Sequence, residues 1–196
     1  MSFILGLTGS IAMGKSTTAG FFRELGIEVF DSDAVVHRLY KERGATLLKP
    51  YFPESVSSGI VDRRKLAAEV TDNPERLKLL ESLVHPLVFE ERNRFLDSAA
   101  ARNRRLIVLD VPLLFETNHD EWCQAVAVVT ASEAVQRQRA LERPEMTEAK
   151  FMTLLNKQMP DREKRKRAHF IIDTGRGFDP ARKQVSDIIR CLCCRG

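Results

Sequence analysis

The chain has 196 residues, of which 43% are hydrophobic and 30% are charged, and its formal net charge is +4. A chain of this length and composition can bury one sizeable core, which favours a single α/β unit with small insertions over a disordered protein. The positive charge is mild, and no basic stripe is interleaved with aromatic residues, so we expect small polyanions rather than nucleic acid as ligands. No apolar stretch has the length of a membrane span or of a signal peptide, so we expect no membrane partner.

The first apolar run, Phe3 to Thr8, predicts a strand, and Thr17 to Leu25 predicts a helix with one buried face. Between them the octet Gly9 to Ser16 matches G-x-x-x-x-G-K-[ST], the phosphate-binding loop of enzymes that use nucleoside triphosphates. We expect Lys15 to reach the β- and γ-phosphates of ATP and the Ser16 hydroxyl to help hold Mg²⁺. The ATP-binding residues expected in this loop are Ala12, Met13, Gly14, Lys15, Ser16 and Thr17.

A second strand, Ile27 to Phe30, ends in Asp31-Ser32-Asp33. In open α/β sheets the ligand crevice lies outside the carboxyl ends of the strands, so we expect at least one of these acids to face the bound phosphates. Asp33 is the candidate general base for a phosphoryl transfer. The alternative is that Asp33 only caps a helix that begins at Ala34.

Almost everything between the second strand and the third is predicted to be helical. The expected helices span residues 34–43, 62–70, 74–84 and 87–101, with a looser stretch at 44–59 and a break at His85-Pro86. This block is too long for a simple crossover, so we interpret it as an inserted subdomain that binds the second substrate. His85 could equally be a hydrogen-bonding residue at a helix junction.

The clearest buried strand, Arg105 to Asp110, ends in an acid, as does the strand that holds Mg²⁺ in other enzymes with this loop. A GTPase switch would show D-x-x-G after this strand and N-K-x-D further on. The chain has Val111 to Glu116 after the strand, and Asn156-Lys157-Gln158-Met159 lacks the final aspartate. These differences argue against a GTP-dependent switch.

Ala125 to Thr130 and Phe170 to Asp173 predict two more strands. A helix from Ser132 to near Pro144 and another from Thr147 to Met159 separate them, as in a lid that folds over a triphosphate. Arg139 and Arg143 are four residues apart and therefore share one helical face. The charged run at 162–167 favours a solvated surface.

A closing helix is expected over Pro180 to Cys194. Because its C-x-C-C cluster lacks a second pair of ligands, we expect reduced thiols there rather than a zinc site. Reduced thiols are typical of a cytoplasmic protein, so we expect that location.

Taken in order, these segments resemble the dephospho-CoA kinase family over nearly the whole chain. The resemblance rests on Gly6-Leu7-Thr8-Gly9 with the phosphate loop, Asp31-Ser32-Asp33, Asp62-Arg63, His85-Pro86, Asp110 to Glu116, Gln136, Arg139, Arg143 and Gln158. It implies a P-loop NTPase-type three-layer α/β fold with a five-stranded parallel sheet. The implied domains are a nucleotide-binding core (1–33, 103–132 and 168–196), a helical insert for dephospho-CoA (34–102) and a lid (133–167).

The resemblance also implies the reaction, an ATP-dependent phosphorylation of the ribose 3′-hydroxyl of dephospho-CoA. Asp33 would be the base, Lys15, Arg139 and Mg²⁺ would neutralise the transferring phosphoryl group, and Arg143 would bind ATP. The implied substrate-binding residues are Asp33, Arg63, His85, Pro86 and Glu116, and the implied metal-binding residues are Ser16 and Asp110. No obligate protein partner is expected.

Four residues depart from the family pattern, namely Ala12, Leu154, His169 and Thr174. If position 12 needs a left-handed backbone, its Cβ costs about 1 kcal/mol. Two alternative functions stay open from the residues themselves. One is another kinase of this class that acts on a nucleoside or nucleotide. The other is an ATP-binding regulatory protein that hydrolyses ATP slowly without an acceptor.

Overall fold

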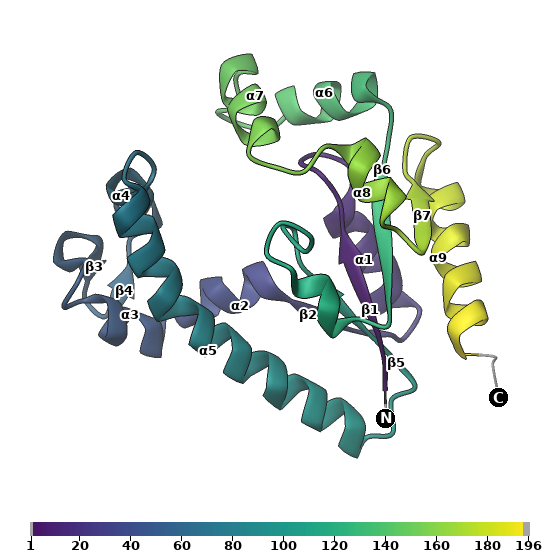
Figure 1. The fold of residues 1–196 in the computed structure, drawn as a ribbon, viewed down its shortest axis with the longest axis horizontal. Coiled ribbons are helices and arrows are strands. Elements are labelled where there is room, and N and C mark those ends of the chain that lie inside the picture. The colour runs from purple at the N-terminus through teal and green to yellow at the C-terminus, as the bar shows by residue number, and fades with distance from the viewer. Residues whose placement is uncertain (1, 194–196) are drawn as a thin grey trace. The chain divides into compact units, whose positions relative to one another are not determined.

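The computed structural model describes residues 2–193, which form two compact units (Figure 1). Of the described residues, one unit comprises 2–30 and 99–193, and the other comprises 31–98. The long helix α5 (Pro74–Ala101) contributes residues to both units. The two units are described separately below.

The first unit contains a five-stranded sheet with the strand order β2-β5-β1-β6-β7. Its strands are β1 (Phe3–Thr8), β2 (Glu28–Asp31), β5 (Leu106–Asp110), β6 (Ala125–Thr130) and β7 (Phe170–Asp173). The central strand β1 runs parallel to β5 and β6, and its register pairs Leu7 with Asp110 and Thr8 with Val128. The carboxyl ends of β1, β5 and β6 therefore meet at one edge, and the P-loop NTPase-type α/β fold predicted from the sequence is confirmed.

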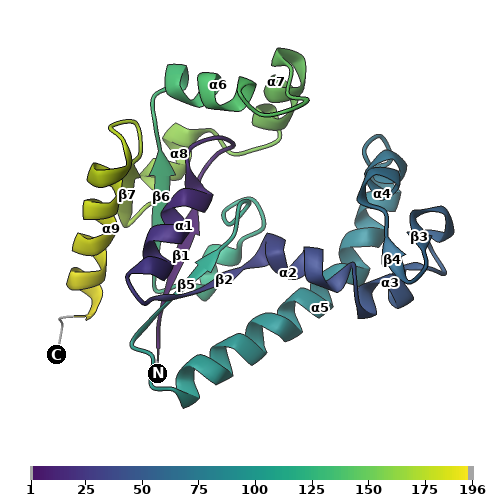
Figure 2. The ribbon, with the colours of Figure 1, turned by 180° about the vertical axis from the view of Figure 1, so that it is seen from behind.

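Two helices pack together on the sheet, α1 (Lys15–Glu24) and α9 (Phe178–Cys193). Figure 2 shows α1 in front of β1 and α9 beside β7. Their apolar faces close the main core, in which Phe22 and Val185 are completely buried against strand residues such as Val108. The closing helix is confirmed up to Cys193, and the predicted end at Cys194 lies outside the described residues. Within the described part of the chain, Cys123, Cys191 and Cys193 form no disulfide.

Three short helices follow β6, namely α6 (Glu133–Leu141), α7 (Glu148–Asn156) and α8 (Asp161–Lys166). A hydroxyl caps each of the first two, because Ser132 Oγ accepts the Val135 N–H and Thr147 Oγ1 accepts the Lys150 N–H. Figure 1 shows α6 and α7 beyond the carboxyl ends of the strands. This is the segment that the sequence predicts as a lid; it belongs to the first unit, and a separate lid stays a prediction.

The second unit has its own small core. Its other elements are α2 (Ser32–Leu39), α3 (Arg43–Leu48), the 3₁₀ turn η1 (Pro53–Ser55), β3 (Val56–Ser57), β4 (Ile60–Val61) and α4 (Arg63–Val70). Leu48, Phe52 and Leu66 are at most 3% exposed and pack with Leu80 and Val84 of α5. The sequence does not predict the antiparallel pair β3–β4, because its two-residue strands are too short to show an alternating pattern.

The predicted break at Pro86 is wrong. The helix α5 runs through this proline without interruption. A proline removes one backbone hydrogen bond and costs about 3 kcal/mol inside a helix. Residues on both sides of Pro86, such as Val84 and Val88, pack on the same apolar cluster, which offsets this cost. Ion pairs also join this unit's other helices to α5, since Arg38 contacts Glu91 and Arg43 contacts both Glu90 and Glu91.

Two further expectations about residues 133–167 are wrong. The helix α6 ends at Leu141 rather than near Pro144, because the residue before a proline avoids the helical backbone conformation. Arg143 therefore lies in the exposed turn after α6, and the argument that it shares a helical face with Arg139 does not hold. The run at 162–167 is not a purely solvated surface, because Lys164 is completely buried.

The described residues include no helix that combines the length and the apolar character needed to cross a membrane. The longest helix, α5, contains glutamates and arginines along its length, among them Glu90, Glu91 and Arg94, which form ion pairs.

Candidate active site

The loop between β1 and α1 has two residues with a left-handed backbone, Ala12 (φ 62°) and Gly14 (φ 91°). They lie on either side of Met13, whose N–H donates to the Ser10 carbonyl and closes a turn. Loops with alternating backbone conformation of this kind turn several N–H groups inward and form a concave site for anions. The adjacent amino-terminal end of α1 adds its positive dipole end. The geometry of the loop is that of a phosphate-binding site.

Gly14 is required by its backbone conformation and by its neighbours. A Cβ at this position would lie 3.1 Å from Thr174 Oγ1, on a backbone that side-chain-bearing residues rarely adopt. We predict that Gly14→Ala strains the loop by about 1–2 kcal/mol and weakens Mg²⁺–ADP binding roughly tenfold. Isothermal titration calorimetry measures this. The control is Gly20→Ala in α1, where a Cβ meets no atom within 4 Å; equal affinities for both variants would contradict the prediction.

Ala12 has the left-handed backbone that the sequence analysis considered as a condition for a conformational cost at this position. Its side chain is only 6% exposed and packs with Ala140 of α6 and Phe151 of α7. The Ala12 methyl group thus packs the phosphate loop against α6 and α7. This contact offsets part of the conformational cost of an alanine in the left-handed region.

Lys15 and Asp110 lie side by side, with 2.6 Å between Lys15 Nζ and Asp110 Oδ1. Asp110 ends β5 and is only 2% exposed, while Lys15 begins α1. The register of β1 and β5, which aligns Leu7 with Asp110, explains why the two charges meet. The two residues that the sequence assigns to phosphate and to metal therefore lie at one point.

Ser16 and Thr17 are exposed in the first turn of α1. Thr18 faces inward instead, and its hydroxyl donates to the Gly14 carbonyl at 3.0 Å. Among the described residues there is no cluster of three or more His, Cys, Asp or Glu side chains that could hold a metal ion. A site with one carboxylate and one hydroxyl suits Mg²⁺, which usually keeps several waters and binds substrate phosphates rather than a protein cage. Ser16 and Asp110 fit that pattern.

Thr174, just after β7, connects the loop to Arg139 of α6. The Thr174 hydroxyl lies 2.8 Å from the Met13 carbonyl, and Arg139 donates to both the hydroxyl and the carbonyl of Thr174 at 2.9 Å. Met13 itself is almost fully buried, and its Sδ accepts the Ala131 N–H. Met13 can therefore contact a nucleotide through its backbone but not through its side chain. The departure at Thr174 thus has a structural role beneath the phosphate loop.

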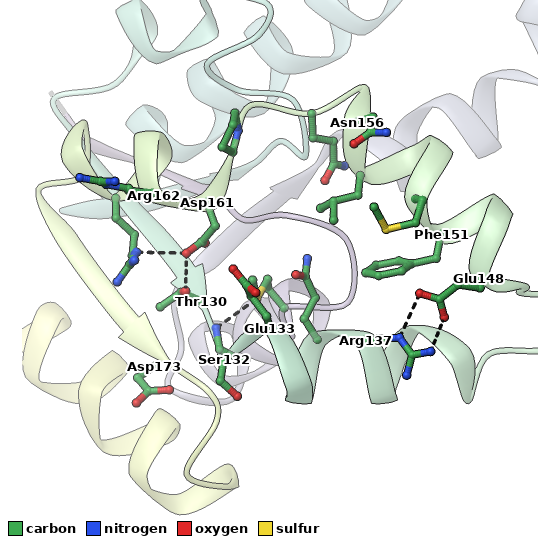
Figure 3. A pocket seen from close by; sticks show the side chains of 18 residues that line it. Thr130, Ser132, Glu133, Arg137, Glu148, Phe151, Asn156, Asp161, Arg162 and Asp173 are labelled. Atoms are coloured by element: carbon green, nitrogen blue, oxygen red, sulfur yellow. Dashed lines mark hydrogen bonds and ion pairs between the residues drawn. The ribbon is translucent and has the colours of Figure 1, made fainter.

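A cleft of about 880 Å³ lies beside the loop, between α6, α7 and α8 (Figure 3). Figure 3 shows Arg137 and Glu148 facing each other across α6 and α7, where their closest charged atoms are 2.7 Å apart. On the other side, Asp161 Oδ2 accepts the Thr130 hydroxyl and pairs with Arg165. Acids and arginines are mixed along the cleft, so the lining favours no single sign of charge.

Glu116, predicted to bind substrate, lies in the first unit and is largely buried. Its Oε1 accepts the Met159 N–H at 2.8 Å and lies 2.8 Å from the ammonium group of Lys164. Glu116 therefore anchors the segment between α7 and α8 to the loop after β5. A role in binding substrate stays a prediction.

The buried pair of Lys164 and Glu116 should matter for stability. We predict that Lys164→Ala lowers the free energy of unfolding by roughly 3 kcal/mol, because it leaves a largely buried carboxylate without its cation. Urea unfolding measures this change. The matched control is Lys166→Ala on the same helix, whose pair with Glu163 is about half exposed and should contribute little to stability. Similar losses for the two variants would contradict the prediction.

The remaining predicted site residues lie in the second unit. Asp33 is exposed in the first turn of α2 and does not cap it, because the cap is Asp31, whose Oδ1 accepts the Ala34 N–H at 2.9 Å. The capping alternative for Asp33 is therefore wrong. Whether Asp33 faces the phosphates stays a prediction.

Arg63 is the first residue of α4, which Asp62 caps. Burial raises the pKa of the nearby Tyr40 hydroxyl, and the positive charge of Arg63 partly offsets that rise. His85 and Pro86 are exposed in the middle of α5, and the His85 ring makes an edge contact with Phe89. His85 is thus not at a helix junction, and its side chain is accessible.

A family model described as dephospho-CoA kinase matches residues 3–179 of the chain. The dephospho-CoA kinase of Mesorhizobium japonicum is 51% identical over 186 residues, which cover 95% of this chain and 94% of that protein. That of Bradyrhizobium diazoefficiens is 48% identical over 186 residues, with the same coverage of 95% and 94%.

Two solved structures share the fold of this chain. A crystal structure of a Thermus thermophilus protein has a TM-score of 0.85 and 34% identity, with 97% of each chain covered. The dephospho-CoA kinase from Campylobacter jejuni has a TM-score of 0.68 over 97% of each chain and, at 23% identity, shows the shared fold alone. From the extent and identity of these matches, the chain belongs to the dephospho-CoA kinase family.

Proposed function

We propose that the chain transfers the γ-phosphoryl group of ATP to the ribose 3′-hydroxyl of dephospho-CoA, which yields coenzyme A and ADP. Membership of the family supports this reaction, and the main structural support comes from the phosphate loop. Ala12 and Gly14 of the phosphate loop have a left-handed backbone, and Lys15 of the same loop pairs with Asp110, which supports binding of a triphosphate there. We further propose that the enzyme acts in the cytoplasm, where ATP is available.

The phosphate loop and Lys15 would hold the β- and γ-phosphates. The inward N–H groups of the loop and the ammonium group of Lys15 would stabilise negative charge as the phosphoryl group moves to the acceptor. Ser16 and Asp110 would hold Mg²⁺, which neutralises phosphate charge when it is bound. Contact with a phosphate would require Lys15 to share its ammonium group between Asp110 and ATP.

The acceptor is a neutral sugar hydroxyl, which is a poor nucleophile until a base takes its proton. We propose Asp33 as this base, because its carboxylate is exposed and is not used to cap α2. We propose that Arg63, His85 and Pro86, which are exposed on the same unit as Asp33, contact dephospho-CoA. Glu116 is a further proposed substrate-binding residue. Arg139 and Arg143 would bind ATP phosphates, for which Arg139 must exchange its bonds to Thr174.

The test is the position of the transferred phosphoryl group. The enzyme is incubated with Mg²⁺–ATP and dephospho-CoA, and ³¹P NMR of the product should show a new phosphomonoester on the 3′-oxygen. An analogue without the 3′-hydroxyl should give no product and no more ADP than a reaction without acceptor. Phosphorylation at another oxygen, or of the analogue, would contradict the proposed function.

A further inference from the structure

Both backbone polar groups of Ile11, inside the phosphate loop, are bound by glutamine side chains. The Ile11 N–H donates to Gln158 Oε1 at 2.9 Å, and Gln136 Nε2 donates to the Ile11 carbonyl at 2.8 Å. Gln136 belongs to α6 and Gln158 follows α7, so the two amides come from different segments of residues 133–167. The Ile11 N–H is thus bound by Gln158 and is not available to a phosphate oxygen, and the Ile11 carbonyl is bound by Gln136.

The two glutamines have opposite tasks. Gln158 must present its oxygen, because it meets an N–H, and Gln136 must present its NH₂ group, because it meets a carbonyl. Gln136 is only 4% exposed, so water cannot easily replace it at the carbonyl. The polarity of each amide is therefore defined by its partner, which makes the arrangement testable by substitution.

Each glutamine is itself held in place. Beside Gln158, the Met159 N–H donates to Glu116, which also pairs with the buried Lys164. Four residues from Gln136 on the same face of α6, Ala140 is fully buried and packs with Ala12 of the loop. The clamp thus links the phosphate loop to anchored residues on two sides.

We propose that Gln136 and Gln158 are positioning residues that form a clamp on the Ile11 peptide and set the shape of the phosphate loop for nucleotide binding. They touch the loop and not the reacting atoms. The clamp holds Ile11, so that Ala12 and Gly14 keep their left-handed conformations and the following N–H groups stay turned inward. The proposal rests on the use of ATP at this loop, which is part of the proposed function.

The test replaces each glutamine by glutamate and by methionine, and measures Mg²⁺–ADP binding by calorimetry. Glutamate keeps an acceptor for the Ile11 N–H but has no donor for the Ile11 carbonyl. We expect Gln158→Glu to bind ADP within about threefold of wild type and Gln136→Glu to bind roughly tenfold or more weakly. Both methionine variants should also bind roughly tenfold more weakly, because methionine supplies neither group.

A second readout follows the clamp directly. Hydrogen exchange of the Ile11 amide, measured by NMR, should accelerate in Gln158→Met and stay slow in Gln158→Glu. If the buried variant Gln136→Glu fails to fold, the exchange rates of the two Gln158 variants still test the proposal. The matched control is Gln138→Glu, an exposed glutamine on the same helix, which should leave ADP affinity unchanged.

Equal effects of glutamate at the two positions would overturn the proposal, whether both variants bind ADP normally or both bind it weakly. Unchanged Ile11 exchange in Gln158→Met would overturn it as well. ADP binding needs no acceptor, so these outcomes are distinct from a failure of the proposed function. If the wild-type enzyme binds ADP but does not phosphorylate dephospho-CoA, the function fails while the clamp can still be judged.

Discussion

Lys15→Ala is expected to abolish phosphoryl transfer, with a fall in kcat of about 10³-fold or more. The substitution removes the ammonium group that we propose contacts the transferring phosphates and stabilises their negative charge. It also removes the ammonium group that lies 2.6 Å from the buried carboxylate of Asp110. Steady-state ADP release in the presence of dephospho-CoA measures the loss.

Two controls separate chemistry from folding in this experiment. Lys183→Ala removes an exposed lysine from α9 and should leave kcat unchanged. The double variant Lys15→Ala/Asp110→Asn removes both charges, so it should regain stability lost in Lys15→Ala without regaining activity. Substantial transfer by Lys15→Ala would mean that the loop does not hold the phosphates of the donor.

Asp33→Asn is expected to lower kcat by roughly 10²-fold or more while ADP affinity stays close to that of wild type. Asparagine has nearly the same shape as aspartate but cannot accept the proton of the sugar hydroxyl. Because Asp31 and not Asp33 caps α2, the substitution should leave the helix intact. Single-turnover transfer to dephospho-CoA measures the chemical step, and thermal unfolding checks the fold.

The matched control for the base is Asp72→Asn, which makes the same change at an exposed position of the same unit. It should transfer at the wild-type rate. A normal rate for Asp33→Asn would remove Asp33 from the role of base. Weak ADP binding by that variant would instead indicate that Asp33 acts on the nucleotide.

Elements with a local signal could be predicted from the sequence. The apolar runs that became β1, β5 and β6 are fully or largely buried, and the hydroxyls of Ser132 and Thr147 mark the starts of α6 and α7 where they were expected. The phosphate loop was predictable because its glycines and lysine have a fixed spacing between a strand and a helix.

Features that depend on tertiary contacts could not be predicted. Pro86 stays within α5 because packing on both sides of it outweighs a local rule. Lys164 is buried because Glu116, far away in the sequence, supplies its counter-charge. In the clamp, Gln136 and Gln158 lie 125 and 147 positions after Ile11 in the sequence. The one local signal is that Gln136 shares an inward face of α6 with Ala140. This spacing predicts that Gln136 is buried, but it does not predict that Gln136 binds the Ile11 carbonyl.

The most direct test of the proposed function is ADP release from Mg²⁺–ATP with dephospho-CoA, adenosine, AMP or no acceptor. We predict that only dephospho-CoA stimulates release and that mass spectrometry finds one added phosphoryl group on it. Stimulation by adenosine or AMP instead would contradict the proposed acceptor while leaving the phosphate loop intact. Equal release in all four reactions would contradict a kinase activity altogether.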